Sequence, residues 1–192
     1  MNSNYKVLKF KSGSSNEVDD QISIEEPLEI IIKYKDKEKW IENTISITMR
    51  TPGDDEDLVR GFLFNERVIE KIDYIENIEL TGEKVGKYNL KNKIIIRINN
   101  SKNIDIDKIK RNFLTNSSCG VCGKTSLDSL EIIMKDKIIK SIPKVNQEII
   151  MKSPDVLRKN QTEFSKTGGI HASGLFNLNG DIIAIKEDVG RH

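Results

Sequence analysis

The chain of 192 residues carries 31 basic and 30 acidic side chains, so its formal net charge is only +1. Because no excess of positive charge surrounds the molecule, we exclude a general nucleic-acid-binding protein and expect any anionic ligand to need a local site. No apolar run approaches the roughly 20 residues needed to cross a bilayer, and the N-terminus lacks the pattern of a leader peptide. We therefore expect a cytoplasmic protein with no membrane partner.

The first half of the chain is predicted to be rich in β-strands. Residues 27–50 alternate apolar and polar side chains around a charged turn at 35–38, as expected for a hairpin with one face on a core. After the turn Thr51-Pro52-Gly53 the apolar spacing becomes helical, and acidic residues 54–57 suit a helix N-terminus. Further strands are predicted at 73–80 and 93–99. Near the N-terminus only residues 12–17 have the composition of a loose segment.

The second half is predicted to alternate helices and strands. One helix should begin at Thr125 or Ser126, and another at the N-cap Ser153, with Pro154 in its first turn. Two glycines end this second helix. The stretches 170–177 and 181–188 then flank Leu178-Asn179-Gly180, which is a strong signal for a β-hairpin.

Both cysteines of the chain, Cys119 and Cys122, lie in the stretch NSSCGVCGKTS. In a reducing compartment a structural disulfide is disfavoured, so the pair indicates metal binding or thiol chemistry. Gly120 and Gly123 remove bulk beside the sulfurs, while Lys124 and the helix that follows would lower the pKa of the thiols. The motif alone leaves both chemistries open, together with a buried turn in which cysteine acts as a small hydrophobic residue.

A zinc site is one interpretation of the two cysteines. Zinc prefers four ligands, and besides the cysteines the chain offers only His171 and His192. Two Cys and one His would resemble the zinc deaminases, whose signature joins H-x-E to a later P-C-x-x-C. Here Ser173 stands where the general acid/base Glu is needed, and the cysteines precede the histidine. We expect no zinc, and a zinc-dependent, deaminase-like hydrolase stays as an alternative.

Glycines and charged residues near the end of the chain form a candidate anion site. The two glycines could present backbone N–H groups to a phosphate, although an ordinary helix C-cap explains them equally well. The charged residues gather at the end of the last strand, where functional groups often lie, but a solvated turn explains them equally well. Arg50 is a further possible anion binder. The candidate binding residues are Gly168, Gly169, His171, Lys186, Asp188 and Arg191.

Four stretches together resemble the FdhD family, the sulfur carrier proteins needed to make formate dehydrogenase active. The resemblance spans nearly the whole chain in order, and the cysteine segment is its specific part. The stretches are EEPLEI (25–30), TMRTPGDDEDLVRGFLF (48–64), RNFLTNSSCGVCGKTSLD (111–128) and TGGIHASGLF…EDVGRH (167–192).

The resemblance implies a function in which sulfur moves through the cysteines. The chain would accept persulfide sulfur from a cysteine desulfurase and pass it to a molybdenum or tungsten bis-pyranopterin guanine dinucleotide cofactor before that cofactor enters formate dehydrogenase. The cysteine motif of the family maps onto Cys119 and Cys122, and we favour Cys119 as the persulfide bearer. The resemblance also implies a homodimer and binding of guanine nucleotides such as GDP, which stand in for the ends of the cofactor. A non-catalytic chaperone that only binds the cofactor is the other alternative.

The implied fold class is α/β of the α+β kind, with a cytidine-deaminase-like, three-layer domain and an N-terminal β-rich portion. We predict that the β-rich portion covers residues 1–105 and contains one helix. The deaminase-like portion would cover 106–192 and carry the cysteine loop. Since family members continue beyond EDVGRH, we expect this portion to be incomplete at its C-terminal side.

Overall fold

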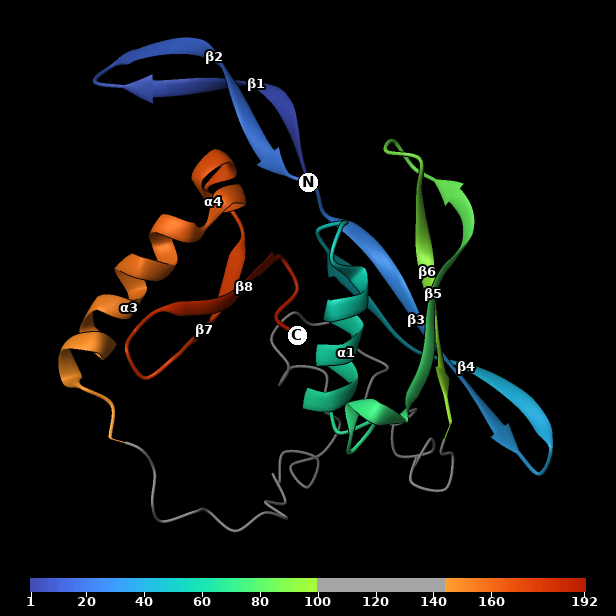
Figure 1. Ribbon diagram of the computed structural model, residues 1–192. Helices are drawn as coiled ribbons and strands as arrows, with labels where there is room; N and C mark the ends of the chain where they lie inside the picture. The colour runs from blue at the N-terminus through green and yellow to red at the C-terminus, as the bar shows by residue number, and fades with distance from the viewer. Residues whose placement is uncertain (100–143) are drawn as a thin grey trace, which may run out of the picture. The chain divides into compact units, whose positions relative to one another are not determined.

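The computed structural model describes residues 1–99 and 144–192, which belong to two compact units (Figure 1). Among these residues, the first unit combines 1–24 with 144–189, and the second combines 25–99 with 190–192. Both cysteines and the helix predicted from Thr125 or Ser126 lie outside the described residues. Each unit thus brings together segments that are far apart in the sequence.

A four-stranded sheet with the strand order β4-β3-β6-β5 forms the frame of the second unit. β3 pairs antiparallel with β4 and parallel with β6, and β5 pairs antiparallel with β6. The predicted turn between β3 and β4 is confirmed, with Lys37 and Glu38 both at positive φ. The strands are β3 (Glu26–Asp36), β4 (Lys39–Arg50), β5 (Ile75–Val85) and β6 (Leu90–Ile98).

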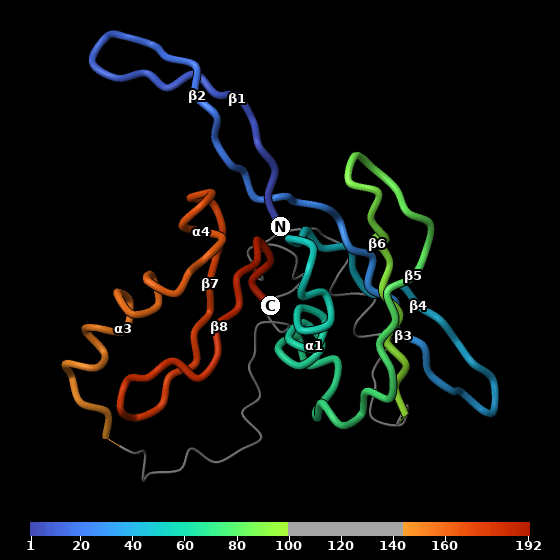
Figure 2. The backbone as a smooth tube through the Cα atoms, turned by 45° about the horizontal axis from the view of Figure 1, so that its top comes forward, coloured from blue at the N-terminus to red at the C-terminus, as the bar shows by residue number. Residues whose placement is uncertain are grey.

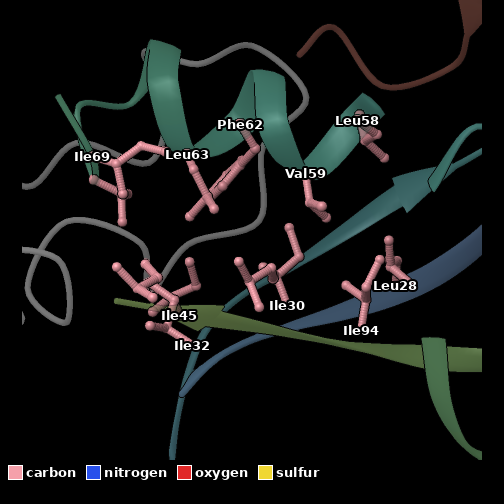
Figure 3. Close-up of a cluster of buried hydrophobic side chains, with 13 residues drawn as sticks. Leu28, Ile30, Ile32, Ile45, Leu58, Val59, Phe62, Leu63, Ile69 and Ile94 are labelled. Carbon is pink, nitrogen blue, oxygen red and sulfur yellow. The ribbon is translucent and has the colours of Figure 1, made fainter. Parts of the chain in front are cut away.

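Helix α1 (Asp55–Asn65) covers one face of this sheet, and their contact forms the core of the second unit (Figure 3). Alternate residues of β3 and β6 are fully buried, as a strand period of two requires. The helix contributes residues at helical spacing, after the acidic first turn predicted from the sequence. A short 3-10 helix, η1 (Ile72–Tyr74), leads into β5. The main core residues are Leu28, Ile30, Ile32, Leu58, Val59, Phe62, Leu63, Ile94, Ile96 and Ile98.

The described residues of the first unit form two antiparallel hairpins and two helices (Figure 2). One hairpin joins β1 to β2, and it includes residues 12–17, which we predicted to be loose. That prediction is wrong because Ser12 and Gly13, both at positive φ, form a tight turn and Ser14 already begins the second strand. The elements are β1 (Asn2–Lys11), β2 (Ser14–Ser23), α3 (Gln147–Asn160), α4 (Thr162–Thr167), β7 (His171–Phe176) and β8 (Ile182–Asp188).

Helix α3 begins earlier than the sequence pattern suggested. Asn146 is its N-cap, and its side chain accepts a hydrogen bond from the backbone N–H of Glu148 at 2.9 Å. Pro154 therefore lies inside the helix, where it has no N–H to donate to the carbonyl of Ile150. The hydroxyl of Ser153 donates to that carbonyl instead, at 2.9 Å. Ser153 is thus not an N-cap, and its hydrogen bond helps the helix to accommodate the proline.

The α+β class and the β-rich N-terminal portion are confirmed by these elements. The predicted hairpin at 170–188 is also confirmed, as strands β7 and β8. The three-layer, deaminase-like arrangement stays a prediction. Within residues 1–99 and 144–192, no helix is long and apolar enough to cross a membrane.

Candidate functional site

The β7–β8 hairpin brings three of the predicted binding residues onto one face. His171 lies directly opposite Asp188, and Ser173 lies directly opposite Lys186. Residues that face each other across a pair of strands share one side of the sheet, as do residues two apart on one strand. His171, Ser173 and Lys186 are exposed and Asp188 is half-buried. We call these four residues the polar face of the hairpin.

The other face of the hairpin is occupied by the helices of the same unit. A Cβ on Gly174 would lie only 2.8 Å from Cδ1 of Leu157 in α3, so glycine lets the helix approach this strand closely. Glu187, whose neighbours in the strand are on the polar face, points to α4. Its carboxylate accepts hydrogen bonds from the backbone N–H groups of Glu163 and Phe164, both at 2.9 Å. Helices α3 and α4 thus contact the side of the hairpin opposite the polar face.

The glycines that precede β7 are held as a helix terminus. Gly168 has φ of 68°, in the left-handed region that glycine adopts without strain, and its N–H donates to the carbonyl of Phe164 at 2.8 Å. The geometry of Gly168 is therefore that of a helix C-cap, which is one of the two roles considered for it. The N–H of Gly169 has the hydroxyl of Thr167 at 3.5 Å, which is a long contact. Phosphate binding at Gly168 and Gly169 stays a prediction.

Helix α4 and its glycines are also fixed to the N-terminal hairpin. The hydroxyls of Ser23 and Thr167 lie 2.8 Å apart, and the side-chain amide of Asn2 donates to Glu163 at 2.9 Å. Burial alone would raise the pKa of Glu163, but hydrogen bonds from Asn2 and Lys166 outweigh it and lower the pKa. The carboxylate of Glu163 therefore stays charged and keeps the hairpin attached to α4.

The side chain of Arg50 is buried in the second unit, where it bonds to residues of α1 and β6. Its side chain is 1% exposed, and its Nε donates to Oδ1 of Asp55 at 2.6 Å. Its Nη2 donates to the carbonyl of Lys91 and to the side-chain oxygen of Asn92, at 3.2 and 3.1 Å. The guanidinium thus joins the end of β4 to the start of α1 and to β6, while its buried Nη1 has no hydrogen-bond partner among the described residues. Anion binding by Arg50 stays a prediction.

Arg191 and His192 belong to the second unit. The side chain of Arg191 is exposed. Nε2 of His192 lies 3.0 Å from Oε1 of Glu66 in the turn after α1. Among the described residues, no group of three or more His, Cys, Asp and Glu side chains could hold a metal ion. The expected absence of zinc stays a prediction, because the cysteines lie outside those residues.

Two residues with a part in this site were missing from the predicted set. Ser173 belongs to the polar face, and strand alternation from His171 could have found it. Glu187 holds α4 in place, but its partner backbone groups lie 23 and 24 positions earlier in the chain. No local pattern in the sequence reports such a contact.

A model of the FdhD/NarQ family matches residues 23–192 of the chain. The sulfur carrier protein FdhD of Sulfolobus acidocaldarius is 38% identical over 187 residues, covering 97% of this chain and 64% of the relative. Its counterpart in Picrophilus torridus is 45% identical over 175 residues, covering 91% and 61%. The chain thus spans somewhat less than two thirds of the length of these relatives.

A solved structure shows the same fold. It is the crystal structure described as a formate dehydrogenase accessory protein from Desulfotalea psychrophila, with a TM-score of 0.60 and 21% sequence identity. The match covers 99% of this chain and 64% of that one. The family match includes the cysteine motif and the polar face, and nearly the whole chain aligns with curated relatives. The chain therefore belongs to the FdhD/NarQ family.

Proposed function

We propose that this chain carries sulfur for the maturation of formate dehydrogenase, receiving it from a cysteine desulfurase and delivering it to a molybdenum or tungsten bis-pyranopterin guanine dinucleotide cofactor. The observation that carries the proposal is the family match over residues 23–192, which contains both cysteines. Curated relatives that align with nearly the whole chain are named sulfur carrier proteins. In this proposal the cofactor is the substrate, and the sulfur transfer takes place in the cytoplasm.

The sulfur is received by thiol–persulfide exchange. The thiolate of Cys119 attacks the outer sulfur of the donor persulfide, and a new S–S bond forms as that of the donor breaks. The donor cysteine leaves as a thiolate and takes up the proton lost by Cys119. Because the sulfane sulfur only changes its cysteine partner, this step needs no oxidant or reductant.

Delivery to the metal uses the second cysteine. The thiolate of Cys122 attacks the inner sulfur of the Cys119 persulfide, so that a Cys119–Cys122 disulfide forms and hydrosulfide leaves. The two thiols supply the two electrons that turn sulfane sulfur into sulfide, which becomes the ligand of the metal. A cellular dithiol then reduces the disulfide and resets the carrier.

The polar face of the β7–β8 hairpin provides chemistry for the nucleotide end of the cofactor. Lys186 offers an ammonium group for a phosphate oxygen, and the hydroxyl of Ser173 lies at the opposite strand position. The carboxylate of Asp188 can accept hydrogen bonds from the amino edge of guanine. GDP presents both the guanine and the phosphates, and we use it as the probe for this site.

Intact mass spectrometry tests the carrier role. The chain is incubated with cysteine and a cysteine desulfurase, with and without a thiol reductant. We expect a gain of one sulfur atom that reductant removes, absent from Cys119→Ala and retained by the matched variant Cys122→Ala. No gain in a protein whose thiols are shown to be reduced would refute the carrier role.

Simple measurements distinguish the sulfur carrier from the two alternatives, a zinc-dependent hydrolase and a cofactor-binding chaperone. Elemental analysis of protein purified without chelator should find no stoichiometric zinc, and one zinc per chain held by Cys and His would favour a hydrolase. A cofactor chaperone would keep its whole activity in formate dehydrogenase maturation when both cysteines are replaced by alanine.

Sedimentation at several protein concentrations tests the proposed homodimer.

A further inference from the structure

The β1–β2 hairpin extends beyond the helix that holds its base (Figures 1 and 2). Asn2 and Ser23 lie directly opposite each other at the open end of the hairpin. Their side chains bond to Glu163 and Thr167 of α4. Each strand has ten residues, and the pairing runs from there to the turn without a shift of register. The side-chain bonds between the hairpin and α4 therefore lie at its base.

Two large apolar side chains near the turn of this hairpin are exposed. Leu8 is 63% exposed and Phe10 is 80% exposed. Because both are an even number of positions from Asn2 on a strand without a bulge, they lie on the face that contacts α4 at the base. Across the ladder they face Glu17 and Ser15 rather than apolar residues. We call this surface the hairpin face, and it comprises Lys6, Leu8, Phe10, Ser15, Glu17 and Asp19.

The far half of the hairpin exposes apolar surface that a single pair of strands needs to cover. Two strands alone are marginally stable in water, and a third strand or a packed helix is needed to stabilise them. Helix α4 packs at Asn2 and Ser23, but the exposed fractions of Leu8 and Phe10 show that it does not cover them. A partner that buries these two side chains would therefore stabilise the hairpin itself.

The charges of the hairpin favour a second copy of the chain as that partner. When two hairpin faces stack about a twofold axis parallel to the strands, β1 of one copy lies over β2 of the other. Lys6 then lies over Asp19 of the partner subunit, and symmetry repeats the pair. Opposite charges meet throughout this stacking, because the charged residues of β1 are all basic and those of β2 are all acidic: Lys6, Lys9 and Lys11 against Glu17, Asp19 and Asp20.

The same stacking covers the exposed apolar side chains. Leu8 and Phe10 of both copies point toward the common axis, between two sheets that pack about 10 Å apart. An anionic lipid surface is a poorer partner for these side chains, because Glu17 and Asp19 on the same face would meet its negative charge. A second hairpin supplies both the apolar surface and the opposite charge.

We propose that the hairpin face is the contact surface between two copies of this chain, with β1 of each hairpin stacked over β2 of the other. This inference rests on the proposed function, because it names the surface of the proposed homodimer. Leu8 and Phe10 form the buried centre of the contact, and the surrounding charges set the alignment of the strands. All residues of the hairpin face belong to the first unit.

Sedimentation velocity at a series of protein concentrations tests the proposal. We expect Leu8→Asp and Phe10→Asp each to raise the Kd of the dimer about tenfold or more, since each buries a carboxylate in the apolar centre. The matched control is Ile22→Asp, which places the same charge at a residue that is 46% exposed on the other face of the hairpin. It should leave the Kd within about twofold of the wild type.

A charge-exchange experiment separates pairing between copies from pairing within one hairpin, where Lys6 and Asp19 are also opposite. Lys6→Glu or Asp19→Lys alone sets like charges over each other in its own dimer and should raise the Kd about threefold or more. An equimolar mixture of the two variants restores two opposite-charge pairs between the copies, while each hairpin keeps its internal mismatch. The mixture should therefore associate more tightly than either variant alone, and equal association would contradict the stacking.

The outcomes distinguish this inference from the proposed function. A wild-type dimer whose Kd is unchanged in Leu8→Asp and Phe10→Asp would overturn the hairpin contact and retain the homodimer. A wild type that is monomeric at every concentration would overturn both. If that monomer binds vesicles of phosphatidylcholine and phosphatidylglycerol and Phe10→Asp does not, the hairpin face belongs to a lipid surface instead. The gain of sulfur at Cys119, measured by intact mass, reports the carrier role independently of these results.

Discussion

His171 and Asp188 occupy directly opposite positions on β7 and β8, and Lys186 lies on the same face. Strand pairing therefore brings together residues 17 positions apart without any contribution from a loop. The helices of the first unit contact the other side of this hairpin through Leu157 and Glu187. The helices of the first unit thus contact the hairpin on the side opposite the polar face, and the residues of the polar face can be substituted one at a time.

Lys186→Gln should weaken GDP binding about tenfold to a hundredfold, because a hydrogen bond to a charged group contributes about 1.5–3 kcal/mol. The matched control is Lys152→Gln, which removes an exposed lysine from α3 in the same unit. Isothermal titration of both variants at two salt concentrations checks the prediction. Equal affinity of the two variants would mean that GDP does not use the polar face.

Glu187→Ala should destabilise the first unit by about 1 kcal/mol, since the first turn of α4 loses the carboxylate that accepts from its N–H groups. Faster hydrogen exchange at the amides of Glu163 and Phe164 is the local signature. Glu148→Gln, in the exposed first turn of α3, is the control. Unchanged exchange at both amides in Glu187→Ala would contradict the capping role.

Asp55→Ala should destabilise the second unit by about 3–5 kcal/mol, because it leaves the buried guanidinium of Arg50 without its charged partner. Glu56→Gln breaks the exposed pair with Arg60 and should cost no more than about 1 kcal/mol. Urea unfolding of both variants gives the comparison. Similar small losses for the two variants would show that Arg50 does not depend on Asp55.

Glu163 should make the stability of the chain depend on pH in the acid range. Its pKa in the folded state is lowered from the ordinary 4.5, so the stabilisation is fully present above that value and is lost as pH falls through the folded pKa. Chemical denaturation at a series of pH values below neutrality should show a smaller acid loss in Glu163→Gln than in the wild type.

Asn2→Ala tests the cause of this pH dependence. It removes a hydrogen bond that favours the charged carboxylate, so part of the acid loss should disappear while Glu163 is still present. Combining both substitutions should add little beyond Glu163→Gln alone. A pH dependence identical to the wild type in Asn2→Ala would assign the lowered pKa of Glu163 to its other partners.

Local patterns in the sequence predicted much of the described fold. The alternation at 27–50, the helix after Thr51-Pro52-Gly53 and the hairpin around Leu178-Asn179-Gly180 were all confirmed. Hydrophobic period and turn residues act within a few positions, so they can be read without knowing the partner segment. The same local reasoning failed at Ser153, because Asn146 caps the helix and a side-chain hydrogen bond accommodates Pro154.

By itself, the sequence determined the family, the cysteine motif and three of the four residues on the polar face. Only the tertiary structure decided which partners those elements meet. Arg50 is neutralised by Asp55 within a buried junction, Glu187 caps a helix that precedes it by more than twenty residues, and His192 reaches Glu66 across 126 positions. Such contacts depend on how separate elements pack, and packing is set by the summed burial of many side chains rather than by any local pattern.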